Sequence, residues 1–312
     1  MKTLAVFCAL ALLPGAALAA DLPDWAYPVA PQGLPSKADA SKVVRAEGST
    51  KQYTEAQIDD PFGPPDWFPG EHPAMPPVVA HGVKPAVIAC GRCHLPDGSG
   101  HPESSSLAAL PAGYMIRQME DYAAGRHTGP RKASMVRIAK ALSAEDNKAS
   151  AEYYAALPLQ AGYIKVVEQA TVPKSYVGEG NMRFVDPKGG TEPLGQRIIE
   201  LPRSEEQARA RNPHFGFVAY VPKGSIARGE KLAKGGNGKT IACASCHGEG
   251  LKGLGPVPSL AGRSAIFLVR QLMDMQAGRR TGEWTTLHAP VNAKLDTGDI
   301  IALAAYAASR AP

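Results

Sequence analysis

Two short stretches decide the fold of this chain: Cys90-Gly91-Arg92-Cys93-His94 and Cys243-Ala244-Ser245-Cys246-His247. Both have the pattern C-x-x-C-H, which is the attachment motif of a c-type haem. The cysteines form thioether bonds to the porphyrin, and the histidine is the proximal ligand of the iron. The sequence therefore predicts two covalently bound haem c groups. Their attachment sites are Cys90, Cys93, Cys243 and Cys246, and their proximal iron ligands are His94 and His247.

The first twenty residues have the features of a secretory signal peptide. Lys2 is positively charged, Leu4 to Leu13 is an apolar run, and Ala17 to Ala20 are small residues suited to cleavage. We therefore expect residues 1–20 to be removed and the mature protein to be periplasmic. No later stretch approaches 18 uninterrupted apolar residues, so no transmembrane span is expected. The two motifs also argue against a disulfide framework, and the long gap between them argues against a structural zinc site.

The chain repeats itself at a shift of 153 residues, the distance from Cys90 to Cys243. Without a gap, this shift aligns the segments 88–90 with 241–243, 106–108 with 259–261, 117–118 with 270–271, 124–126 with 277–279, and 128–129 with 281–282. A repeat of this length is a small domain and not a solenoid element.

The residue pattern predicts a mainly α-helical protein. Helices are expected over 114–124, from Ser143 to Pro158, over 225–234 and from Asp296 onward. The helix over 225–234 precedes the second motif, and prolines disrupt the equivalent stretch before the first motif. Short strands are expected over 163–167, 196–201 and 215–221. We thus expect a signal peptide (1–20), an irregular Pro-rich extension (21–80), two haem domains (81–160 and 226–312) and a β-containing insert (161–225).

Each iron needs a sixth ligand or an open position. In the first copy the candidates are Met115, Met119, His127 and Met135. Met115 and Met119 lie on an amphipathic helix, which favours a packing role. Met135 follows Gly129-Pro130 in a predicted loop before the last helix, and it is the preferred ligand.

The same shift places His288 at the position of Met135. We therefore expect His288 to bind the second iron. The alternative is an exposed loop histidine, with Met273, Met275 or water as the ligand. Because methionine ligation raises the reduction potential relative to histidine, the first haem should have the higher potential.

Arg117 and Arg270 occupy equivalent positions on the helix after each motif. One interpretation is that they pair with haem propionates through bidentate guanidinium–carboxylate contacts. The other is that they lie on a solvated helix face.

With these motifs in place, the chain resembles class I cytochromes c. The features are C-x-x-C-H, then S-L-A, a helix with R-Q and A-G-R, a loop ligand and a late tyrosine. The tandem copy is similar to the diheme, cytochrome c4-like group of periplasmic electron carriers. The resemblance covers 81–160 and 226–312 and implies helical domains, proximal His94 and His247, distal Met135, and one-electron transfer between redox proteins. His288 departs from it, because a methionine is expected there.

The leading function is thus an electron carrier with redox protein partners, and an enzyme is less expected. The alternative is a haem subunit or a catalytic diheme oxidoreductase of dehydrogenase or peroxidase type. Thiosulfate dehydrogenases typically use a cysteine ligand, and none remains here, but His288 offers a peroxidase a displaceable ligand.

Residues 226–312 contain eleven basic and six acidic side chains. This favours an acidic partner near the second domain, although a solvated face explains it equally well, and nucleic acid is not expected.

Overall fold

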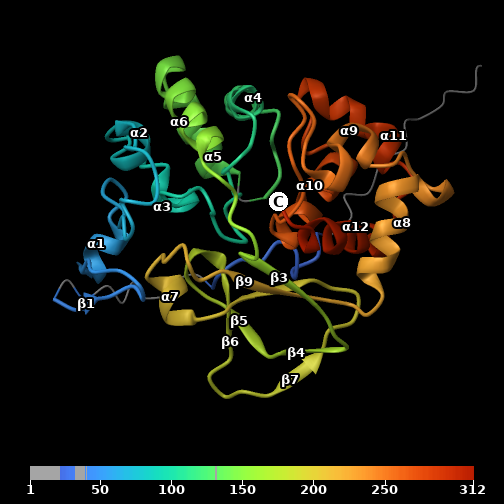
Figure 1. Cartoon of the computed structure of the whole chain (residues 1–312), viewed down its shortest axis with the longest axis horizontal. Coiled ribbons are helices and arrows are strands. Elements are labelled where there is room, and N and C mark those ends of the chain that lie inside the picture. The colour runs from blue at the N-terminus through green and yellow to red at the C-terminus, as the bar shows by residue number, and fades with distance from the viewer. Residues whose placement is uncertain (1–21, 32–38, 40, 131) are drawn as a thin grey trace, which may run out of the picture.

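The structure is a computed structural model that describes residues 22–31, 39, 41–130 and 132–312, so the expected signal peptide lies outside the described residues. Figure 1 shows two helical halves side by side, with a layer of short strands beneath both. Within the described ranges, no helix is both long and apolar enough to cross a membrane.

The first helical half follows the N-terminal extension. Its helices are α2 (Pro77–Ala80), α3 (Gly91–His94), α4 (Ala112–Ala123), α5 (Ala133–Ala141) and α6 (Ala144–Ala156). The chain leaves α4 through Gly125, whose φ of +72° suits glycine. The Ser143 hydroxyl accepts a hydrogen bond from the Asp146 amide at 3.0 Å and thereby caps α6. The prolines before Cys90 permit only the short α2. This helix begins at Pro77, because proline is tolerated at the first helical position.

The second helical half has the expected longer helix before its motif. Its α-helices are α8 (Ser225–Gly235), α9 (Ala244–His247), α10 (Ala265–Gln276), α11 (Ala289–Asn292) and α12 (Thr297–Ser309), and its 3-10 turns are η2 (Gly236–Gly238), η3 (Glu249–Leu251) and η4 (Glu283–His288). Asp296 starts α12 through a capping box with Asp299. Helices α8 and α12 cross where Gly229 lies against the carbonyl of Ala302.

The insert between the halves forms several small sheets. Its elements are β3 (Ile164–Glu168), β4 (Thr171–Pro173), β5 (Ser175–Val177), η1 (Glu179–Asn181), β6 (Arg183–Val185), β7 (Thr191–Pro193), β8 (Ile199–Pro202), α7 (Glu205–Arg209) and β9 (Phe217–Val221). Strand β9 pairs in parallel with β3 and antiparallel with β8. These three strands overlap the three predicted ones, whereas the pairs β4–β7 and β5–β6 were not predicted.

One buried carboxylate joins this insert to the second half. Glu200 on β8 accepts hydrogen bonds from the Ser264 hydroxyl at 2.7 Å and from the Ala265 and Ile266 amides at 2.6 and 3.2 Å. It thus occupies the N-terminus of α10, where the helix dipole favours negative charge. Burial nevertheless dominates and raises the pKa of Glu200 to about 7.

The N-terminal extension contains β1 (Val43–Val44), β2 (Tyr53–Thr54) and α1 (Glu55–Asp59) within largely irregular chain. Two of its aromatic residues anchor it to other parts of the molecule. The Trp67 indole donates a hydrogen bond to the Ala210 carbonyl at 2.7 Å, and the Tyr27 hydroxyl donates to Asp274 at 2.8 Å. The extension therefore packs on both the insert and the second helical half.

We predict that Gly229→Ala destabilises the second helical half. An added Cβ would lie 2.0 Å from the Ala302 carbonyl oxygen, which belongs to backbone and cannot rotate away. Such overpacking costs about 1–3 kcal/mol of unfolding free energy, measurable by denaturant titration of the haem-loaded protein. Gly235→Ala is the control, because a Cβ there meets nothing within 4 Å. An equal loss in both variants would contradict the steric explanation.

Candidate haem sites

A single large cavity is lined by both C-x-x-C-H motifs. Its volume is about 1770 Å³, well above the roughly 300–1,000 Å³ of an ordinary ligand pocket. All eight predicted site residues line it: Cys90, Cys93, His94, Met135, Cys243, Cys246, His247 and His288. The cavity is therefore large enough for more than one bulky cofactor, and the structure brings the predicted residues together around it.

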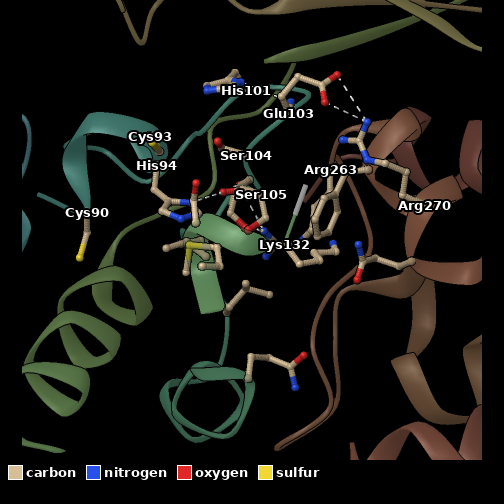
Figure 2. Close-up of a pocket in the computed structure, with 18 of the residues that line it drawn as sticks. Cys90, Cys93, His94, His101, Glu103, Ser104, Ser105, Lys132, Arg263 and Arg270 are labelled. Carbon is tan, nitrogen blue, oxygen red and sulfur yellow. Dashed lines mark hydrogen bonds and ion pairs between the residues drawn. The ribbon is translucent and has the colours of Figure 1, made fainter. Parts of the chain in front are cut away.

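Both motif histidines are oriented by a backbone carbonyl. Nδ1 of His94 lies 2.8 Å from the Ser105 carbonyl, and Nδ1 of His247 lies 2.7 Å from the Pro258 carbonyl. Because a carbonyl can only accept, Nδ1 carries the proton in each ring, and the Nε2 lone pair is left for a metal. Burial lowers the pKa of both histidines, which keeps the rings neutral. Figure 2 shows the His94–Ser105 contact.

The cysteines of each motif lie next to these histidines on short helices. Cys90 precedes α3, Cys93 lies within it, and all four motif cysteines are unpaired thiols. Burial raises the pKa of Cys90 to about 12 and that of Cys243 to about 11. An uncharged sulfur, such as that of a thioether, suits this apolar wall. The residues therefore fit a covalently attached haem c, which supplies one-electron iron chemistry when bound.

In the second half, two histidines face each other across the cavity. The ring centres of His247 and His288 are 6.1 Å apart. Two imidazoles that bind one metal at about 2 Å from each nitrogen have ring centres roughly 6 Å apart. His288 lies at the end of η4 and not in an open loop, and burial lowers its pKa to about 4. Met275 also lines the cavity, whereas Met273 packs in the core and does not line it.

In the first half, the geometry leaves several candidate ligands. Met135 lines the cavity from α5, so the predicted loop around it is wrong: residues Ala133–Ala141 form a helix. Met115 and Met119 line the same cavity from α4. His127 also lines the cavity, at the boundary between the halves, where it forms a β-bridge with Arg280. The preference for Met135 thus rests on its correspondence with His288.

Known proteins similar to this chain were found by sequence and by structure. No family model matches the chain. Cytochrome c4 from Stutzerimonas stutzeri is 26% identical over 226 residues, which cover 70% of this chain and 83% of that protein. The thiosulfate dehydrogenase electron acceptor of Stutzerimonas stutzeri (strain A1501) is 26% identical over 231 residues, covering 73% and 82%. The crystal structure of reduced recombinant cytochrome c4 from Pseudomonas stutzeri matches with a TM-score of 0.45 and 24% identity, covering 71% and 93%.

The two C-x-x-C-H motifs and the similarity to cytochrome c4 proteins point to the same kind of protein, one with two c-type haems. The chain is a diheme class I cytochrome c. This diheme cytochrome carries two covalently bound haem c groups.

The paired arginines of the diheme cytochrome are not equivalent in the structure. Arg270 is buried, forms an ion pair with Glu103 at 3.2 Å and donates to backbone carbonyls, so partners within the protein occupy it. Arg117 stacks on the Trp284 ring at 4.1 Å, and its Nη2 is buried without a hydrogen-bond partner. Of these two arginines, Arg117 keeps a donor suited to a haem carboxylate.

The two halves hold each other through reciprocal turns after α4 and α10. The Thr128 amide donates to the Arg279 carbonyl at 2.8 Å, and the Thr281 amide donates to the Arg126 carbonyl at 2.9 Å. These four residues pair up under the 153-residue shift. The contact therefore follows the internal repeat and has approximate two-fold symmetry.

Carboxylates complete this clasp, by which we mean residues 121–129 and 274–282. Asp121 accepts from Arg126 in its own half and lies against Gly282 of the other half. Asp274 makes the matching contacts with Arg279 and Gly129. A side chain at either glycine would collide with the facing carboxylate. The sequence repeat displayed these residues, but only the structure shows that they meet.

Covalent attachment can be tested one motif at a time. We expect acid–acetone-extracted native protein to retain two haem masses, because each motif forms its own thioether pair. The variant Cys90→Ala/Cys93→Ala should retain one haem mass, and Cys243→Ala/Cys246→Ala should retain the other. Mass spectrometry of the intact chain measures this. A native mass equal to that of the bare polypeptide would contradict the attachment.

Proposed function

We propose that this diheme cytochrome transfers single electrons between redox proteins in the periplasm. The observation that supports this most strongly is the shared cavity, in which both motifs contribute neutral, carbonyl-oriented histidines to one interior. Two one-electron sites in one interior suit a relay that accepts an electron at one half and releases it at the other. A relative described as a thiosulfate dehydrogenase electron acceptor supports the same type of role.

The proposed site residues follow the motif and the repeat. Cys90 and Cys93 attach one haem, and Cys243 and Cys246 attach the other. His94 and Met135 would bind the first iron, and His247 and His288 would bind the second. The His247–His288 ring geometry supports the second pair directly.

Unequal ligation should give unequal potentials. Because methionine ligation raises the potential relative to histidine, potentiometric titration of the native protein should resolve two steps, with the first haem higher. The weak far-red absorption band of methionine–iron bonding should come from one haem only. His288→Met should raise the lower potential and strengthen that band.

Met273→Leu is the matched control, because Met273 does not line the cavity. Its spectra and potentials should equal those of the native protein. If His288→Ala left both spectra unchanged and the two native potentials were equal, His288 would not be a ligand, and Met275 would become the candidate.

The surface of the second half supports an acidic partner less strongly than its composition suggests. Arg263, Arg270 and Arg280 are buried, and Arg228 and Lys239 pair with carboxylates. The exposed basic side chains that remain include Lys231, Lys252 and Lys294. The proposed acidic redox partner would bind at these exposed lysines.

A catalytic diheme oxidoreductase is the alternative, and the similarity to thiosulfate dehydrogenase components keeps it open. The carrier proposal predicts that thiosulfate does not reduce the isolated oxidised protein and that peroxide does not turn over with the reduced protein. Two protein ligands at each iron would leave no open position for thiosulfate or peroxide, which explains both outcomes. Optical spectroscopy during mixing measures them, and rapid reduction by thiosulfate alone would favour the enzyme.

A further inference from the structure

A single buried arginine lies between the loops that hold the two motif histidines. Arg263 is 4% exposed and lines the cavity. Figure 2 shows it beside Ser105, on the far side of that loop from His94. Its repeat counterpart in the first half is Leu110, which is buried and apolar. Arg270 and Arg280 are also buried and line the cavity, but of these three Arg263 is the one that bonds to both loops next to the motif histidines.

The guanidinium of Arg263 bonds equivalent residues in both halves. In the first half it donates to the Ser106 carbonyl and hydroxyl at 3.0 and 3.2 Å, and to the Ala108 carbonyl at 3.0 Å. In its own half it donates to the Ser259 carbonyl and hydroxyl at 2.8 and 2.7 Å. These bonds use all five N–H groups of a guanidinium. None is left to donate to a haem carboxylate.

The bonded serines are neighbours of the residues that orient the histidines. Ser106 follows Ser105, which accepts from His94, and Ser259 follows Pro258, which accepts from His247. In each half, two successive loop residues connect Arg263 to the motif histidine: one bonds to Arg263 and the other to the histidine ring.

The charge of Arg263 is not neutralised by the described residues. All its partners are carbonyls and hydroxyls, whereas the nearby Arg270 forms an ion pair with Glu103. Burial lowers the pKa of Arg263 to about 10, which leaves it charged at neutral pH. A buried unpaired cation acts on its surroundings more strongly than one at the surface, because the interior screens it less.

We propose that the positive charge of Arg263 raises the reduction potentials of both haems together. The proposal rests on the proposed electron-transfer function. Oxidised iron has one more positive charge than reduced iron, so a nearby buried cation destabilises the oxidised state of each haem. Because Arg263 contacts equivalent positions of the two loops, it acts on both sites and not on one.

The test compares three substitutions by potentiometric titration of the haem-loaded protein. Arg263→Met removes the charge, and both midpoint potentials should fall, with about a tenfold loss in the preference of each haem for its electron. Arg263→Lys keeps the charge but cannot reproduce the five hydrogen bonds, and both potentials should stay near the native values. Arg197→Met is the control, because it removes an arginine that is paired with Glu192 and does not line the cavity.

Several results would overturn the proposal. A fall in one potential only would remove the shared role, and unchanged potentials in Arg263→Met would remove the role altogether. Equal falls in Arg263→Lys and Arg263→Met would assign the effect to loop geometry and not to charge. If Arg263→Met does not fold, Arg263→Gln replaces it in the comparison with Arg263→Lys. The haem count and the two redox steps of the native protein test the electron-transfer function separately.

Discussion

Each motif histidine donates a hydrogen bond to a backbone carbonyl eleven residues further along the chain, and both haem sites depend on this bond. The bond fixes the protonated nitrogen and the orientation of the ring, so that the other nitrogen is available to iron. It also makes the loop that supplies the carbonyl a part of the metal site. A displacement of Ser105 or Pro258 would therefore change the orientation of the histidine ring that would bind the iron.

The packing of the molecule holds these two loops in place. Arg263 joins them to each other, and Glu200 of the insert anchors the N-terminus of α10 directly after Arg263. The clasp adds backbone hydrogen bonds between the halves, and Tyr27 of the extension binds Asp274 within it. The segments outside the repeat thus brace the haem sites and do not separate them.

The sequence predicted the parts of this structure that local rules control. Capping residues located the starts of α6 and α12, Gly125 located the end of α4, and the motifs located the histidines. The short strands β4 to β7 were not predicted, because segments of three residues around proline and glycine carry little periodicity. Position 135 was placed in a loop because the flanking Gly129-Pro130 concealed the start of α5.

Long-range contacts were beyond prediction for a different reason. Arg263 and Leu110 differ within an otherwise aligned repeat, which was a visible signal, but the alignment does not show what a side chain touches. The same holds for Arg270, whose partner Glu103 lies 167 residues earlier in the chain. Such pairs join residues far apart in the sequence, so no local pattern encodes them.

The reciprocal clasp has a consequence for the history of the chain. Its contacts are those that two identical subunits make around a two-fold axis, where each copy supplies the same patch. Here Asp121 and Asp274, and Thr128 and Thr281, are identical in the two copies, and each residue contacts the other copy. At the cavity the copies differ: His288 occupies the repeat position of Met135, and Arg263 occupies that of Leu110. Fusion of two copies into one chain permits this asymmetry, since a residue then needs to occur only once, whereas a symmetric dimer would place two buried arginines side by side on its axis.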